Sequence, residues 1–76
     1  MNQLPADGRQ VDILAALELI GFSVSRRNKG HLVLGDDTGR MLTLPDHSRI
    51  KEYTLAGALK QAGISKTEFM DAYRQL

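Results

Sequence analysis

The chain has 76 residues, a formal net charge of +1 and no cysteine, so it forms one domain without disulfides or thiolate metal sites. A domain of this length buries only about 60% of the surface that its unfolded chain exposes, and we expect ligands to bind across the surface. The first residues lack the basic start and apolar run of a signal peptide, and no segment reaches the roughly 20 apolar residues of a membrane span, which predicts a cytoplasmic protein.

The first predicted element is a helix that ends at about Ile20. Asp7 and Gln10 have the spacing of a capping box at its start, and Gly21 suits the left-handed position that follows a helix. Apolar residues recur along one helical face, at Ile13, Leu14, Leu17 and Ile20. This stripe is the predicted core-facing side.

Three short strands are predicted next. Phe22 and Val24 alternate with serines, which is typical of a half-buried strand. Turns at residues 28–30 and 35–39, the second containing Asp36 and Asp37, separate this strand from strands at residues 31–34 and 40–44. Pro45 ends the last strand. Short consecutive strands with short turns predict an antiparallel meander.

Two helices close the chain. Thr54 is the predicted N-cap of a helix that ends at Gly63, and Ser65 with Glu68 forms a capping box for a second helix. The predicted order is α-β-β-β-α-α, an α+β fold with a three-stranded antiparallel sheet and helices on one face.

The last two helices also have the spacing of a helix-turn-helix. A recognition helix presents basic or amide side chains to the DNA groove, whereas this one sets Glu68 and Asp71 against Lys66 and Arg74. A net-neutral helix adds little attraction to phosphates, so DNA binding is the less favoured alternative.

Positive charge is concentrated in the first predicted hairpin. Residues 1–22 contain three acids and one arginine, whereas residues 23–35 contain Arg26, Arg27 and Lys29 and no acid. Such a local potential attracts anions even when the total charge is near zero, and Gly30 exposes backbone N–H groups to them. Adjacent arginines on a strand point to opposite faces. The alternative to anion binding is a charged hairpin tip that is only solvated by water.

His31 follows this basic turn and begins an apolar strand. Leu32 and Leu34 share one strand face and should meet the helices, so His31 and Val33 should point to the open face. An imidazole there could act as general acid or base on an RNA phosphodiester, whose 2′-hydroxyl is a built-in nucleophile. The alternative is an exposed histidine with no task.

His47 lies in the loop after Pro45. It is either a loop residue bonded to Asp46 or the backbone, or a partner of His31 in phosphate contact or acid–base chemistry. Two histidines sixteen positions apart, without cysteine, lack the spacing of a zinc motif, so we predict no metal and no cofactor.

Several motifs in this order resemble the HicA toxins, which are small mRNA interferases of bacterial toxin–antitoxin pairs. The resemblance covers roughly residues 9–73 and rests on Gly21-Phe22, Arg27-x-x-Gly30-His31, Leu44-Pro45-x-His47, Tyr53-Thr54-Leu55, the run from Leu59 to Ser65, and Glu68-Phe69.

The resemblance implies a double-stranded-RNA-binding-domain-like fold. From the sequence we expect a flexible tail at residues 1–8 and a single domain at 9–76. The resemblance also implies metal-independent cleavage of mRNA with His31 as the catalytic residue, and a HicB antitoxin that covers the active face. The expected RNA-binding residues are Arg26, Arg27, Lys29, Gly30 and His47.

One position departs from the family pattern. Family members commonly have a serine just before the histidine, where this chain has Lys29-Gly30. The departure bears on substrate preference and activity, and a non-catalytic RNA-binding module of the same fold is the main alternative.

Overall fold

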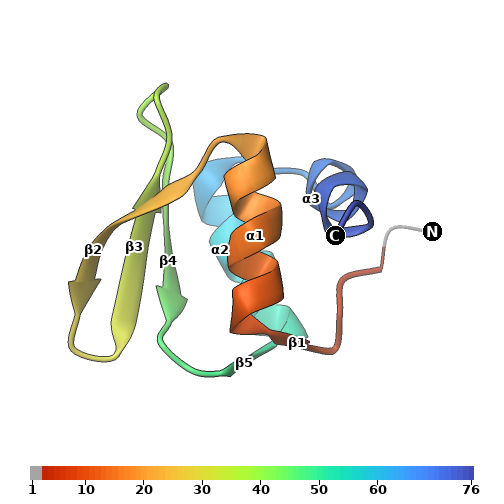
Figure 1. Ribbon diagram of the computed structural model, residues 1–76, viewed down its shortest axis with the longest axis horizontal. Coiled ribbons are helices and arrows are strands. Elements are labelled where there is room, and N and C mark those ends of the chain that lie inside the picture. The colour runs from red at the N-terminus through yellow and green to blue at the C-terminus, as the bar shows by residue number, and fades with distance from the viewer. Residues whose placement is uncertain (1–2) are drawn as a thin grey trace.

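The computed structural model describes residues 3–76 and has the predicted α+β class. Its strands and helices are shown in Figure 1. They are, in chain order, β1 (Asp7–Arg9), α1 (Gln10–Ile20), β2 (Ser23–Asn28), β3 (His31–Gly35), β4 (Met41–Pro45), β5 (Arg49–Lys51), α2 (Glu52–Ala62) and α3 (Lys66–Tyr73).

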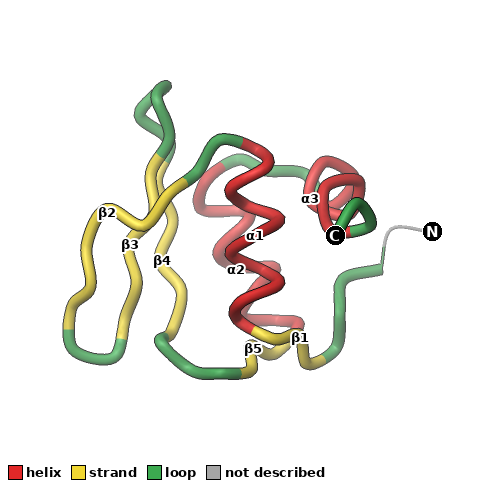
Figure 2. The backbone as a smooth tube through the Cα atoms, viewed as in Figure 1, coloured by secondary structure: helices red, strands yellow, loops and turns green. Residues whose placement is uncertain are grey.

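The main sheet is an antiparallel meander in the order β2-β3-β4, as predicted. Helices α1 and α2 lie on one side of it, and α3 packs against α1 farther from the sheet (Figure 1). The tube in Figure 2 shows that no other described element crosses the opposite side of the sheet. One sheet face is therefore free for a ligand.

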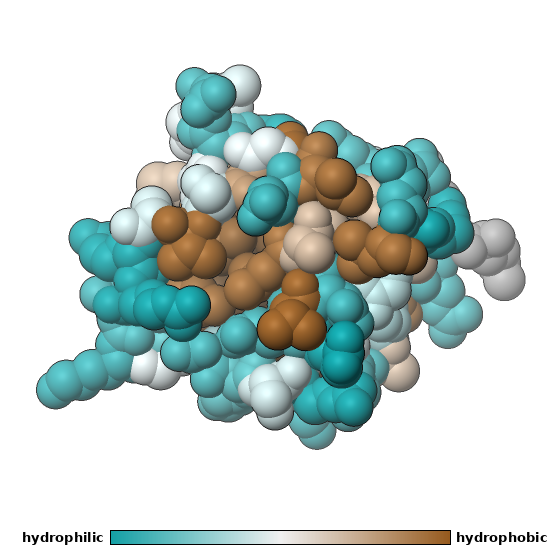
Figure 3. Space-filling model, viewed as in Figure 1, coloured by the Kyte–Doolittle hydropathy of each residue, from teal (hydrophilic) through white to brown (hydrophobic). Residues whose placement is uncertain are grey.

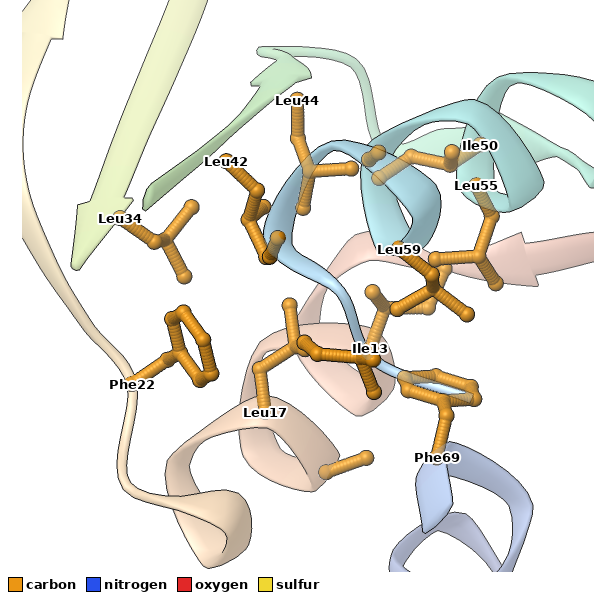
Figure 4. Close-up of a cluster of buried hydrophobic side chains, with 14 of the residues drawn as sticks. Ile13, Leu17, Phe22, Leu34, Leu42, Leu44, Ile50, Leu55, Leu59 and Phe69 are labelled. Carbon is orange, nitrogen blue, oxygen red and sulfur yellow. The ribbon is translucent and has the colours of Figure 1, made fainter. Parts of the chain in front are cut away.

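The hydrophobic core fills the space between the sheet and the helices (Figure 4). Leu34, Leu42 and Leu44 point from the sheet toward Leu17 and Leu59 of the helices (Figure 4). Leu32 and Leu34 are at most 1% exposed, which confirms the predicted core-facing side of β3.

The edge strand β2 differs from the predicted half-buried strand. Phe22 is buried but precedes the strand, and Val24 is 37% exposed. A bulge interrupts the register between Val24 and Arg26, where the Ser25 hydroxyl donates to the Val33 carbonyl at 3.1 Å. An edge strand has only one neighbour and tolerates an extra residue, so the simple alternation fails here.

Strand β4 runs through Pro45 rather than stopping before it. The Thr43 N–H points away from β3, because it donates to Gln61 Oε1 of α2 at 3.2 Å. Pro45 lies two residues farther on and has the same orientation. Its missing N–H therefore removes no hydrogen bond to β3, and Pro45 pairs with His31.

A second, two-stranded sheet was not predicted. β1 pairs antiparallel with β5, so that Asp7 lies opposite Lys51. Backbone bonds flank this ladder, from Gln10 N–H to the Ser48 carbonyl at 2.9 Å and from Glu52 N–H to the Ala6 carbonyl at 3.1 Å. These two bonds satisfy backbone N–H groups at the starts of α1 and α2, a role that side-chain caps have in other helices.

This ladder corrects both predicted helix starts. Asp7 lies in β1 and does not cap α1, whose N-cap residue Arg9 makes no side-chain cap bond. Thr54 lies inside α2, which begins at Glu52. By contrast, the predicted Ser65 cap is confirmed, since its Oγ accepts from the Glu68 N–H at 3.0 Å.

The predicted tail at residues 1–8 begins with two residues that lie outside the described part of the chain. Leu4 is 3% exposed and belongs to the core, and Gly8 lies in β1. The division into a tail and a domain at residues 9–76 stays a prediction.

The β3–β4 turn is organised by Asp36, as its turn role predicted. Burial of this carboxyl opposes its ionisation, but hydrogen bonds from Arg40 and Thr38 outweigh it and lower the pKa of Asp36 to about 2. The turn is therefore held by an ionised carboxylate.

Helix α1 is apolar on nearly all sides. Val11 and Leu19 are 61% and 57% exposed, whereas Ile13 and Leu17 are fully buried. Figure 3 shows apolar side chains gathered at the centre of this view, where α1 lies in Figure 1. In residues 3–76, no helix combines the length and hydropathy needed to cross a bilayer.

Candidate active site on the open sheet face

His31 is the first residue of the central strand β3, and its side chain is exposed. It lies between Asn28 of β2 and Pro45 of β4. Val33, on the same strand face, is 8% exposed but does not belong to the core cluster between sheet and helices. The histidine therefore lies on the predicted open face.

The tautomer of His31 follows from its hydrogen bond. Its Nδ1 lies 3.2 Å from the Lys29 carbonyl oxygen. A carbonyl oxygen only accepts, so Nδ1 carries the hydrogen and donates it. In the neutral ring Nε2 then keeps its lone pair, as a general base requires.

The hairpin between β2 and β3 turns at Lys29 and Gly30. Gly30 has φ = +75°, a left-handed conformation that residues with a Cβ rarely adopt. Its carbonyl accepts from the Asp46 N–H at 2.9 Å. The turn is thereby fixed to the loop that contains His47.

The two arginines lie on opposite faces, and the register shows which one accompanies His31. Arg26 pairs with Val33 across the strands and shares the open face. Arg27 pairs with Leu32 on the helix side, and its guanidinium lies 3.6 Å from the Asp46 carboxylate. The bulge at Ser25 determines this assignment, because uninterrupted alternation from Val24 would reverse it.

His31 and His47 line the same groove, which has a volume of about 520 Å³. The Asp46 carboxylate accepts a hydrogen bond from Gln10 Nε2 at 3.0 Å and lies near Arg27. Within residues 3–76, His47 makes no hydrogen bond. The interpretation of His47 as a loop residue bonded to Asp46 or the backbone is therefore wrong. The two imidazoles, whose relative position the sequence could not show, line one groove.

The groove also contains residues that the sequence analysis did not assign to the site. Arg49 and Lys51 flank the buried Ile50 in β5, and Tyr53 and Thr54 lie in the first turn of α2. The alternation of Arg49, Ile50 and Lys51 was the available signal, but three residues are too few to predict a strand.

The cations of the site are largely available to a ligand. Within residues 3–76, Arg26, Lys29 and Lys51 form no ion pair, and Arg49 donates to the Asp7 backbone carbonyl at 3.1 Å. Asp7 is the acidic residue among those that line the groove. No three histidine, aspartate or glutamate side chains of the described residues gather as a metal site.

The protein is thus a small α+β domain whose helices cover one sheet face, while the other presents a histidine beside cations. Residues 11–64 match the family model described as the HicA toxin of bacterial toxin-antitoxin. This span is more than half of the chain, and the protein belongs to the HicA toxin family. No curated protein matches the chain. Membership of a toxin–antitoxin family implies an antitoxin partner.

Proposed function

We propose that this protein is the toxin of a type II toxin–antitoxin system and cleaves mRNA in the cytoplasm, without a metal ion, through His31. The observation that supports the proposal most strongly is the position of His31 on an open sheet face beside unpaired cations, in a member of the HicA family. An open face admits a polymer that a deep pocket would exclude.

The hydrogen-bonded tautomer supports a role for His31 as the base. Nε2 removes the proton from a ribose 2′-hydroxyl, whose oxygen attacks the adjacent phosphorus, and the bond to the 5′-oxygen breaks. The products are a 2′,3′-cyclic phosphate and a 5′-hydroxyl. His47 lines the same groove and is the residue that we propose to protonate the leaving 5′-oxygen and contact phosphate.

Cations stabilise the charge that develops on the phosphate oxygens. We propose Arg26 and Lys29 for this role, together with backbone N–H groups at Gly30, because Arg26 shares a strand face with His31. The RNA contact expected of Arg27 is not part of this proposal, because its side chain lies on the helix side of the hairpin, near the Asp46 carboxylate.

The proposed partner is a HicB-like antitoxin that covers the open sheet face. Covering this face would block access of RNA to His31 and thereby silence the toxin. Co-expression with the antitoxin should then restore growth.

The test is His31→Ala, compared with wild type for growth arrest and for cleavage of purified RNA. A positioned histidine contributes about 10² to 10⁴ in rate, so the variant should lose cleavage by that factor and no longer arrest growth. The exposed ring supports no core, and circular dichroism should show an unchanged fold. Undiminished cleavage would refute the role of His31, and RNA that is bound but never cut by wild type would support the non-catalytic module instead.

A further inference from the structure

Tyr53 differs from the other aromatic residues of the chain. The two phenylalanines are at most 1% exposed, and Tyr73 stacks on Phe69 with ring centroids 5.6 Å apart. Tyr53 is 76% exposed. An aromatic ring gains from burial, so a ring left in solvent gives the fold little and is available to a ligand.

The position of Tyr53 links it to the candidate active site. It lines the groove that contains His31 and His47, and it also lines a second hollow of about 370 Å³ beside Ala6 and Glu52. Lys51 lines both hollows as well. Tyr53 therefore lies between two concave surfaces that share Lys51.

Exposed aromatic rings next to cations are typical of surfaces that bind single-stranded nucleic acid. Each base offers a flat face for stacking, and the cations contact the adjacent phosphates. In a duplex both faces of an internal base are already stacked on neighbours. A ring such as Tyr53 can stack only on an unpaired or terminal base.

We propose that Tyr53 stacks on an unpaired base next to the phosphodiester at His31, while Lys51 and Arg49 contact the flanking phosphates. Single-stranded RNA is then the substrate class of this groove. The inference rests on the proposed function, since it places a nucleotide of the same RNA. Asp7 also lines both hollows and lies opposite Lys51 in the β1–β5 ladder, so its carboxylate opposes phosphate binding next to that lysine.

The experiment measures RNA binding in a His31→Ala background, where the RNA stays intact. A short oligoribonucleotide is titrated as a single strand and after annealing to its complement. Tyr53→Ala should weaken single-strand binding about 5- to 150-fold, the loss typical of one base stacked on an aromatic side chain. Tyr53→Phe, which keeps the ring, should bind as the parent does, and duplex binding should not change.

Tyrosine fluorescence gives a second readout, because the chain has two tyrosines and no tryptophan. In a Tyr73→Phe background Tyr53 is the remaining tyrosine, and stacking on a base should quench its emission. Quenching by the single strand but not by the duplex supports the proposal.

The outcomes separate this inference from the proposed function. If wild type cleaves RNA and Tyr53→Ala binds and cleaves it equally well, the stacking role is overturned while the ribonuclease stands. If Tyr53→Ala weakens binding but wild type never cleaves RNA, the nucleotide site stands and the catalytic role falls. Equal losses in the alanine and phenylalanine variants, equal losses for duplex RNA, or loss of antitoxin binding alone would each overturn stacking.

Discussion

Replacing Arg26 or Arg27 with glutamine tests which side of the hairpin holds RNA. The two residues are neighbours in sequence and have the same charge, but the bulge at Ser25 places Arg26 on the face of His31. Arg27 lies on the helix side near the Asp46 carboxylate. The two substitutions remove the same charge, so each is the matched control for the other.

The expected magnitude follows from counting phosphate contacts. We propose four cations as phosphate contacts, namely Arg26 and Lys29 of the hairpin and Arg49 and Lys51 of the groove. Each contact to a single strand adds about 0.7 to the slope of log affinity against log salt, so four give a slope near −2.8 and an about 50-fold loss of affinity between about 50 and 200 mM salt. Arg26→Gln should reduce this loss to about 20-fold, and Arg27→Gln should leave it near 50-fold.

Fluorescence anisotropy of a labelled single-stranded oligoribonucleotide, titrated at several salt concentrations in the His31→Ala background, measures the slope. The reasoning is refuted if Arg27→Gln flattens the slope as much as Arg26→Gln does. It is also refuted if Arg26→Gln leaves the slope unchanged, because the open face would then not be where the phosphates lie.

Three further predictions concern stability. Leu32 is fully buried in the central strand, so Leu32→Ala should lower the free energy of unfolding by about 2 to 5 kcal/mol in urea titrations; a loss below about 1 kcal/mol would contradict its place in the core. Ser65→Ala removes the cap that accepts from Glu68 N–H and should reduce that free energy by about 1 kcal/mol, whereas Ser65→Thr should retain most of it. The pKa of Asp36 is about 2 against an ordinary 3.8, so its ionised form stabilises the fold above pH 3.8 and this contribution disappears as the pH falls through 2. Thermal melts should therefore show wild type losing its advantage over Asp36→Asn across that interval, and a constant difference between the two would count against the hydrogen-bonded carboxylate.

The sequence by itself determined those features that depend on neighbouring residues. The change of hydrophobic period separates helices from strands, and the alternation along β3 places His31 and Leu32 on opposite faces of the sheet. The Ser65 cap and the left-handed Gly21 also follow from local backbone chemistry. Each of these involves residues only a few positions apart, whose spacing is visible in the chain.

The tertiary structure alone decided the rest of the site. The β1–β5 ladder replaces the expected side-chain caps, because backbone partners far apart in sequence satisfy the helix starts. The bulge at Ser25 assigns Arg26 to the open face, since an edge strand can accept an unpaired residue without disturbing a second neighbour. His31, His47 and Tyr53 line one groove because chain folding brings β3, the loop after β4 and the start of α2 together. Contacts between such distant segments depend on packing, which no local pattern records.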